Sequence, residues 1–384
     1  MLAIHLSEIG FSATAIGLLI GTGLAGSSLA TLAVSLRGDV WGRRRVLVAI
    51  AMLTAAGYVA LAAFTRAAAL VPLAFAGLIN GMGRDRGPAS ALEQAILPET
   101  VPPERRTWAL AWYNVVLDIG HAGGALAGAT PTFLMRVVEV TPQTAHRATF
   151  LMCAGAMLVS IVPYLALTPR IEVARPDVAA RAVRLDPHSR RVITRLATLF
   201  GLDSIGGGFL SSALIAYWFF RRYGTSEADL AVLFFAARAL NAASHVGAAW
   251  LARRIGLVKT MVWTHLPSSL FLMVAPAAPT APIAAALFLA REALVEMDVP
   301  TRQSYVMAIV KPGERTFASG VTNVTRNVAW AVGPSVAGVV MQHVTLAGPL
   351  LIGGVLKVAY DLVLWRSFRH LRAPEESVLD AAPR

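Results

Sequence analysis

Long apolar segments alternate with short polar connections along most of the chain. Eleven of these segments are close to the length that an α-helix needs to cross a bilayer, about 20 residues. They cover residues 13–35, 46–65, 69–96, 107–134, 149–168, 195–220, 228–250, 259–276, 281–308, 317–342 and 346–365. Since backbone groups inside lipid must hydrogen-bond to one another, the pattern predicts an all-α polytopic membrane protein.

Lysine and arginine gather in every second connection, at residues 37–45, 105–106, 170–195, 253–259, 311–315 and from 366 onward. The other connections hold few basic residues. The positive-inside rule therefore places the first set and the C-terminus in the cytoplasm. The net charge of +12 follows from this arrangement, so we expect no nucleic-acid partner. The lone Cys153 excludes an internal disulfide framework.

This orientation puts residues 1–12 outside and leaves the first apolar segment without a helix before it. Residues 2–6, Leu-Ala-Ile-His-Leu, resemble the outer end of a span. We therefore expect a start upstream, a first helix that ends near residue 10, and eleven helices present of an expected twelve.

The chain repeats itself weakly. An offset of 214 aligns residues 11–48 with residues 225–262 and places Gly42 on Gly256. Two related halves are the simplest interpretation. We predict an N-terminal bundle over residues 1–168, a cytoplasmic linker over 169–194, a six-helix bundle over 195–367 and a cytoplasmic tail over 368–384.

The turn over residues 35–44 reads Ser-Leu-Arg-Gly-Asp-Val-Trp-Gly-Arg-Arg. It resembles the major facilitator signature G-x-x-x-D-R/K-x-G-R-R/K, although Ser35 and Val40 depart from it. The resemblance implies two pseudo-symmetric helical bundles and a gating motif made by Asp39, Gly42, Arg43 and Arg44. The arginines can also be explained by topology alone.

A glycine pattern partly resembles the antiporter motif of the same family. Gly120, Gly124 and Gly128 match, but Ala125 stands where proline is expected, and Gly333-Pro334 occupies the repeat-equivalent place. The match implies export. Close packing of helices would require the same small residues.

Ionisable residues inside the apolar segments nominate the transport pathway, because each needs a partner there. The resemblance implies that three of these segments line the cavity. The candidates are Arg84, Asp85, Arg86, Asp118, Asp203, Arg291, Glu292, Glu296, Asp298 and Arg326. We hypothesise ion pairs of Arg84 with Glu296, Arg86 with Asp298, and Asp118 with Arg326. Glu292 and Glu296 are four residues apart, so either could take up a proton. A static network that only orients helices is the alternative.

The resemblance favours a secondary transporter, and we expect proton-coupled efflux of a small molecule by alternating access. Proton-coupled uptake is the near alternative, and a non-transporting receptor or an inactive remnant is an alternative of another class. The motifs HExxH and GxSxG are absent, so we expect no enzyme. We expect no cofactor, no metal, a monomer, and a multi-pass protein of the bacterial inner membrane.

Overall fold

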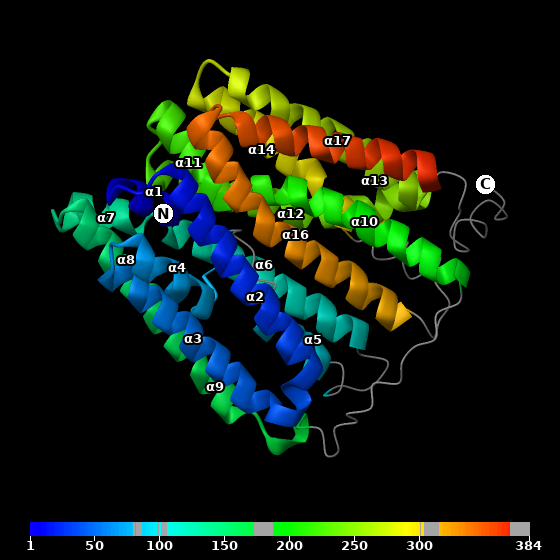
Figure 1. Ribbon diagram of the computed structural model, residues 1–384, viewed down its shortest axis with the longest axis horizontal. Coiled ribbons are helices and arrows are strands. Elements are labelled where there is room, and N and C mark those ends of the chain that lie inside the picture. The colour runs from blue at the N-terminus through cyan, green and yellow to red at the C-terminus, as the bar shows by residue number, and fades with distance from the viewer. Residues whose placement is uncertain are drawn as a thin grey trace. The chain divides into compact units, whose positions relative to one another are not determined.

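The computed structural model describes residues 1–79, 81, 87–97, 100, 106–172, 187–299, 301–302 and 315–368, and every regular element in these residues is a helix (Figure 1). Two short 3₁₀ helices are η3 (Pro169–Ile171) and η4 (Ala275–Ala277). The α-helices are α1 (Leu2–Glu8), α2 (Ala13–Trp41), α3 (Arg43–Ala63), α4 (Ala67–Ala76), α5 (Pro88–Ile96), α6 (Arg106–Ala127), α7 (Thr130–Val137), α8 (Pro142–Val159), α9 (Ile161–Ala166), α10 (Pro187–Phe209), α11 (Ser212–Tyr223), α12 (Glu227–Ile255), α13 (Leu257–Val274), α14 (Ala281–Val295), α16 (Arg315–His343) and α17 (Gly348–Phe368). The predicted all-α class is confirmed for these residues.

Seven helical segments within the described residues are long and apolar enough to cross a membrane. They are Ala13–Val34, Arg43–Ala63, Pro142–Ala166, Ser189–Tyr223, Glu227–Ala252, Leu257–Ala277 and Gly348–Phe368. Each overlaps a span that the hydropathy pattern predicts. The predicted total of eleven is not reached by the part of the chain that is described, and it stays a prediction.

The span expected over residues 69–96 is divided between two helices. α4 ends at Ala76, and α5 begins at Pro88. Proline suits the first turn of a helix, because the N–H that it lacks would have no partner there. The candidates Arg84, Asp85 and Arg86 fall between these helices and lie outside the described residues.

The chain forms two compact units, which we describe separately. The first unit contains Met1–Ala180, Ser211–Val232 and Pro334–Thr345. The second unit contains Arg181–Leu210, Leu233–Gly333 and Leu346–Arg384. Their bounds differ from those of the two bundles expected from the repeat, and the bundles remain a prediction.

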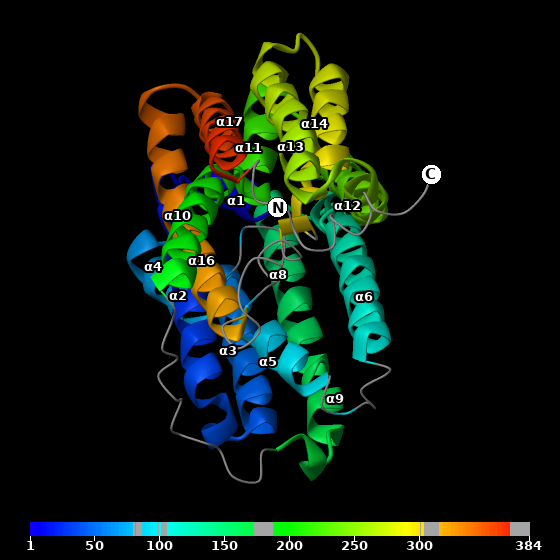
Figure 2. The same ribbon diagram turned by 90° about the vertical axis from the view of Figure 1, so that its right-hand side faces the viewer.

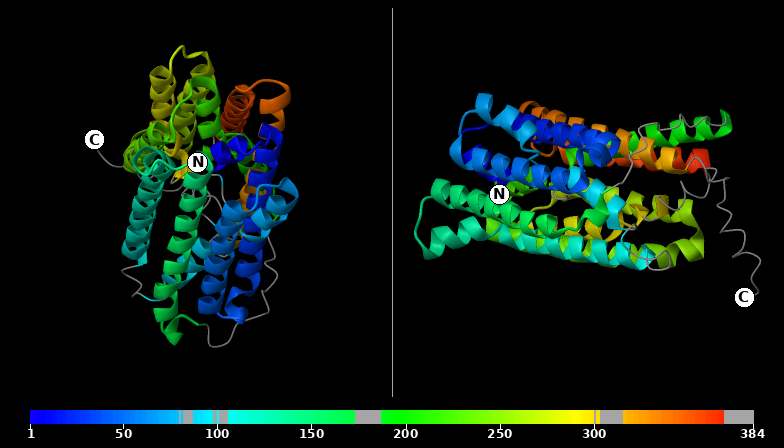
Figure 3. Two further views of the ribbon diagram at one scale, coloured as in Figure 1. Left: turned by 90° about the vertical axis from the view of Figure 1, so that its left-hand side faces the viewer. Right: turned by 90° about the horizontal axis from the view of Figure 1, so that it is seen from below.

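Glycine lets the helices of the first unit pack closely. α2 packs along α4 and α5, and α3 packs along α8 and α9 (Figure 3). A Cβ atom on Gly57 would come within 2.8 Å of the Gly77 carbonyl oxygen, and one on Gly26 would collide with the Phe75 carbonyl. Helices in lipid associate mainly through such close backbone contact, because lipid tails are already apolar.

The turn between α2 and α3 depends on Gly42 and on an acidic side chain from elsewhere. Gly42 has φ +90°, and Gly256, between α12 and α13, has φ +91°. The two positions that the sequence repeat equates therefore share a positive φ, which L side chains rarely adopt. The carboxylate of Glu172 accepts hydrogen bonds from the backbone N–H groups of Arg43 (2.8 Å) and Arg44 (3.1 Å). It satisfies two free donors at the start of α3 and complements the helix dipole.

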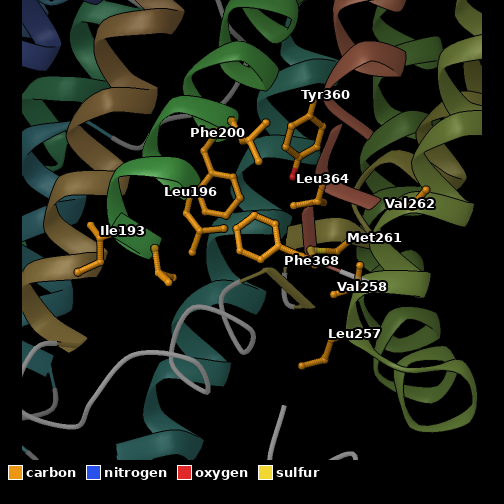
Figure 4. Packing of buried hydrophobic residues seen from close by; sticks show 12 residues of the cluster. Ile193, Leu196, Phe200, Leu257, Val258, Met261, Val262, Tyr360, Leu364 and Phe368 are labelled. Atoms are coloured by element: carbon orange, nitrogen blue, oxygen red, sulfur yellow. The ribbon is translucent and has the colours of Figure 1, made fainter. Parts of the chain in front are cut away.

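The second unit is centred on α10, α13 and α17, which pack side by side. Figure 4 shows Phe200, Leu364 and Phe368 close together in the apolar cluster that joins these helices. α13 continues through η4 into a hairpin with α14 (Figure 2). A Cβ atom on Gly333 of α16 would collide with the backbone of Gly208 of α10. Gly333 therefore serves close packing in this unit.

We predict that Gly42→Ala and Gly256→Ala each destabilise the protein by about 1–3 kcal/mol, because alanine is strained at positive φ. The measurement is thermal unfolding of the detergent-purified variants. Gly155→Ala is the matched control, because Gly155 is helical and a Cβ atom there meets nothing within 4 Å. Equal unfolding temperatures for Gly42→Ala, Gly256→Ala and Gly155→Ala would contradict the prediction.

Candidate functional site

A buried network of charged side chains lies in the second unit, with Asp203 of α10 at its centre. Lys357 of α17 donates to Asp203 Oδ1 at 2.7 Å, and Arg302 lies 3.4 Å from Oδ2. Arg302 also donates to Asp298 at 2.6 Å. None of these four residues is more than 5% exposed. Each carboxylate oxygen of Asp203 is therefore paired with a cationic side chain.

The network continues from Lys357 to His265 of α13 and on to Asp361 of α17. Lys357 Nζ lies 3.3 Å from His265 Nε2, and His265 Nδ1 lies 2.9 Å from Asp361 Oδ1. A lysine ammonium group can only donate, so Nε2 accepts from Lys357. We therefore assign the ring proton to Nδ1, from which it is donated to Asp361. Asp203, Lys357, His265 and Asp361 thus form one continuous hydrogen-bonded chain.

Aromatic rings enclose this network on its apolar side. Arg302 lies over the ring of Phe200 at 5.3 Å, and His265 packs edge-on against Tyr360 at 6.0 Å. Phe200 and Tyr360 are also members of the cluster in Figure 4. Dry surroundings strengthen the ion pairs and make an unpaired charge costly.

Glu292 belongs to a second group of polar side chains in the same unit. Its carboxylate accepts a hydrogen bond from Asn241 at 2.9 Å and contacts the guanidinium of the adjacent Arg291. Glu296 is buried as well, but it lies just past the last residue of α14. Glu292 is thus neutralised by Arg291 and held by an amide, an arrangement that i, i+4 spacing does not reveal.

Arg326 of α16 donates to Ser204 at 3.3 Å and lies over the ring of Trp330 at 4.8 Å. These partners belong to its own unit. Asp118, its expected partner, is a half-buried residue of α6 in the first unit. Their pairing stays a hypothesis, and so do the pairs expected for Arg84 and Arg86, which lie outside the described residues.

The expected gating motif is described in part. Arg43 is buried and donates to the Ile171 carbonyl at 3.1 Å, and Arg44 lies in the first turn of α3. The backbone of Asp39 belongs to α2, but its side chain lies outside what the structure describes. Glu172 is the acid that the structure places at the start of α3, and the sequence analysis did not single it out.

The glycines of the antiporter-like pattern differ in their surroundings. A Cβ atom on Gly120 or Gly124 would meet no described atom within 4 Å, and one on Gly128 would meet the nearby Ala125 carbonyl oxygen at 2.9 Å. Within the described residues, no close helix contact thus accounts for Gly120 and Gly124. Close helix packing does explain Gly333, and the carbonyl of Pro334 likewise lies against Gly17 of α2.

Glu93 of α5 is a carboxylate of the first unit that the sequence analysis also missed. It accepts hydrogen bonds from the hydroxyls of Tyr113 of α6 at 2.7 Å and Tyr164 of α9 at 2.5 Å. Three helices thus meet at one half-buried carboxylate.

Lys357, His265 and Asp361 are the main residues of the network that sequence reasoning missed. All three lie in predicted spans, and Lys357 and Asp361 are four residues apart on one face of α17. Asp203 was chosen because it is an ionisable residue inside an apolar segment, and the same criterion would choose these three residues. Their positions within apolar segments were therefore the available signal.

Comparison with known proteins gives a consistent result. Residues 1–295 match the family model described as Major Facilitator Superfamily. An uncharacterized membrane protein of Saccharomyces cerevisiae is 28% identical over 396 residues, covering 95% of this chain and 88% of the yeast protein.

Two solved structures illustrate the similarity of fold. A bacterial homologue of the human lysosomal transporter Spinster has a TM-score of 0.74 at 14% identity, covering 97% of this chain and 95% of that protein. The inward-open xylose transporter of E. coli has a TM-score of 0.67 at 15% identity, covering 98% and 92%.

We predict that Lys357→Met destabilises the protein by about 3–5 kcal/mol, because it leaves Asp203 with an unpaired buried oxygen. The double variant Asp203→Asn/Lys357→Met should lose less than the sum of the two single variants. Thermal unfolding in detergent measures all three.

The control for this cycle is Lys259→Met, which replaces an exposed lysine of α13 in the same unit. Two outcomes would refute a stabilising Asp203–Lys357 pair. One is that the stability losses of the two single variants add up in the double variant. The other is that Lys357→Met loses no more stability than Lys259→Met.

Proposed function

The chain belongs to the Major Facilitator Superfamily, and on this premise we propose that it is a proton-coupled exporter that moves a small molecule by alternating access. Membership of this family makes it a membrane transporter rather than an enzyme. One observation carries the proposal of proton coupling. It is the hydrogen-bonded chain from Asp203 through Lys357 and His265 to Asp361.

The energetic cost of these groups supports a function for them. An ionisable residue at the centre of a bilayer costs about 2.5–3.5 kcal/mol on insertion scales. A purely structural contact between α10, α13 and α17 is available more cheaply from apolar side chains, as the neighbouring cluster shows. Asp203, Lys357 and His265 can each exchange a proton, and each is in hydrogen-bond contact with the next.

Asp203 is the group at which we propose that proton and substrate compete. Its two oxygens already face Lys357 and Arg302. A proton on Asp203 removes the charge that holds these cations, and a cationic group of a solute would need that same charge. Binding is then mutually exclusive, so inward movement of protons drives outward movement of the solute. The partial antiporter-like pattern of Gly120, Gly124 and Gly128 favours the same direction.

An acidic solute would reverse the coupling. Protonation of Asp203 releases Lys357 and Arg302, and the released cations could then bind an anionic group. Proton and solute would then bind together and move in the same direction, which is uptake by symport. The charge of the transported solute therefore decides between export and uptake.

The orientation in the membrane is part of the proposal. We propose that the basic connections and the C-terminus face the cytoplasm, according to the positive-inside rule. The protein is an integral multi-pass membrane protein. Its assignment to a bacterial inner membrane stays a prediction, and the similar yeast protein indicates that such chains also occur in eukaryotes.

We predict that inside-out vesicles holding the protein accumulate an organic cation, such as tetraphenylphosphonium, when their lumen is acidified. Asp203→Asn should lower this accumulation at least about tenfold, because an amide cannot exchange the proton. The readouts are a cation-selective electrode and a lumenal pH dye, which together relate cation entry to proton exit.

Lys259→Met is the matched control and should transport like the wild type. Proton-linked movement of a benzoate probe, with no movement of the cation, would replace export by symport. If neither probe moves, and no other solute in a broad panel of charged solutes moves either, the result would favour a receptor or an inactive remnant.

A further inference from the structure

Two histidines and two glutamates meet in the first unit, apart from the charged network of the second. His5 and Glu8 belong to α1, and His146 belongs to α8 (Figure 1). Glu227 is the first residue of α12. Three segments that are distant in sequence therefore bring imidazole and carboxylate groups to one place.

His146 is the centre of this group and is completely buried. Its Nε2 lies 3.0 Å from Glu227 Oε1, and its Nδ1 lies 3.1 Å from Glu8 Oε2. The ring of His5 packs at 5.1 Å from that of His146. One ligand atom from each of His5, Glu8 and His146 lies within 4.8 Å of the other two.

Polar atoms in this group lack ordinary partners. His5 is only 2% exposed, and its Nδ1 has no hydrogen-bond partner among the described residues. If His146 donates its Nε2 proton to Glu227, its Nδ1 presents a lone pair directly to a carboxylate. Two facing acceptors repel each other unless a proton or a metal cation lies between or beside them. An orphaned imidazole beside this contact favours the metal.

We propose that His5, Glu8 and His146 bind a divalent transition metal of the zinc class, and that Glu227 positions His146 from behind. Two imidazole nitrogens and a carboxylate are typical ligands for such an ion. A carboxylate on the far nitrogen of a ligating histidine fixes its tautomer and raises its basicity, and Glu227 has this place. The Glu8 side chain is 30% exposed, which leaves an entry path for the ion.

The membrane orientation predicts from which side the metal enters. The N-terminal segment, the connection before α8 and the connection before α12 all belong to the set expected outside the cytoplasm. The metal should thus reach His5, Glu8 and His146 from the outer side. A bound metal ion would link α1 to α8 on the outer side, because its ligands come from both helices.

Zinc binding by the chelator-stripped protein tests this proposal. The full chain is purified in detergent through a tag without histidines and titrated with Zn²⁺ alone in a calorimeter. We expect one ion per chain. His5→Ala and His146→Ala should each weaken binding by more than the roughly 10- to 100-fold that loss of an outer partner costs, and Glu227→Gln should fall within that range.

His343→Ala is the control, because His343 is an exposed histidine at the end of α16, also in the first unit. Glu8→Gln keeps size and replaces a partly exposed residue, so it tests the site even if His146→Ala does not fold. Absence of stoichiometric binding would overturn the proposal and leave a proton shared between His146 and Glu8. Equal binding by the wild type, His5→Ala and Glu8→Gln would also overturn it.

Discussion

The second unit depends on one interaction, the contact of Lys357 with Asp203 in dry surroundings. Without the lysine, the carboxylate would keep only the more distant Arg302. Without the carboxylate, an ammonium group would remain in an apolar cluster. Removing either charge alone therefore weakens the packing of α10 against α17, and both charges remain available for chemistry. A buried pair of this kind serves folding and function with the same atoms.

The first unit follows a different constraint, which is the satisfaction and close approach of the backbone. Gly57 and Gly77 let α3 and α4 touch without side chains between them, and the carboxylate of Glu172 satisfies the start of α3. The Glu172 carboxylate accepts hydrogen bonds from backbone N–H groups at a helix end. Between helices, the hydroxyls of Tyr113 and Tyr164 donate hydrogen bonds to the carboxylate of Glu93.

Helix type, the seven described spans and the burial of Asp203 could be predicted from the sequence, because each follows from local composition. The pairs of interacting side chains could not be predicted, because they depend on how each helix is rotated about its axis. Asp203 was expected to act within a pathway, yet its partner Lys357 lies 154 residues away on α17. Gly42 and Gly256, which the repeat equates, both have a positive φ, and a glycine marks such a position locally in the sequence.

His146 illustrates the same limit. Nothing near it in sequence marks it as a ligand, and Glu227 lies 81 residues further on. The sequence analysis therefore expected no metal. Only the folded chain brings α1 and α8 together, and only there do their ionisable groups share one environment.

The hydrogen bonds that Glu172 accepts at the start of α3 have a consequence for evolution of the chain. Glu172 is one of the first residues of the linker that was expected to join two repeated halves. The linker is therefore anchored to the start of α3 at residue 172. Insertions after that point leave the capped turn intact, whereas a single deletion before it withdraws the carboxylate from α3. Length variation among related chains should begin abruptly at this boundary.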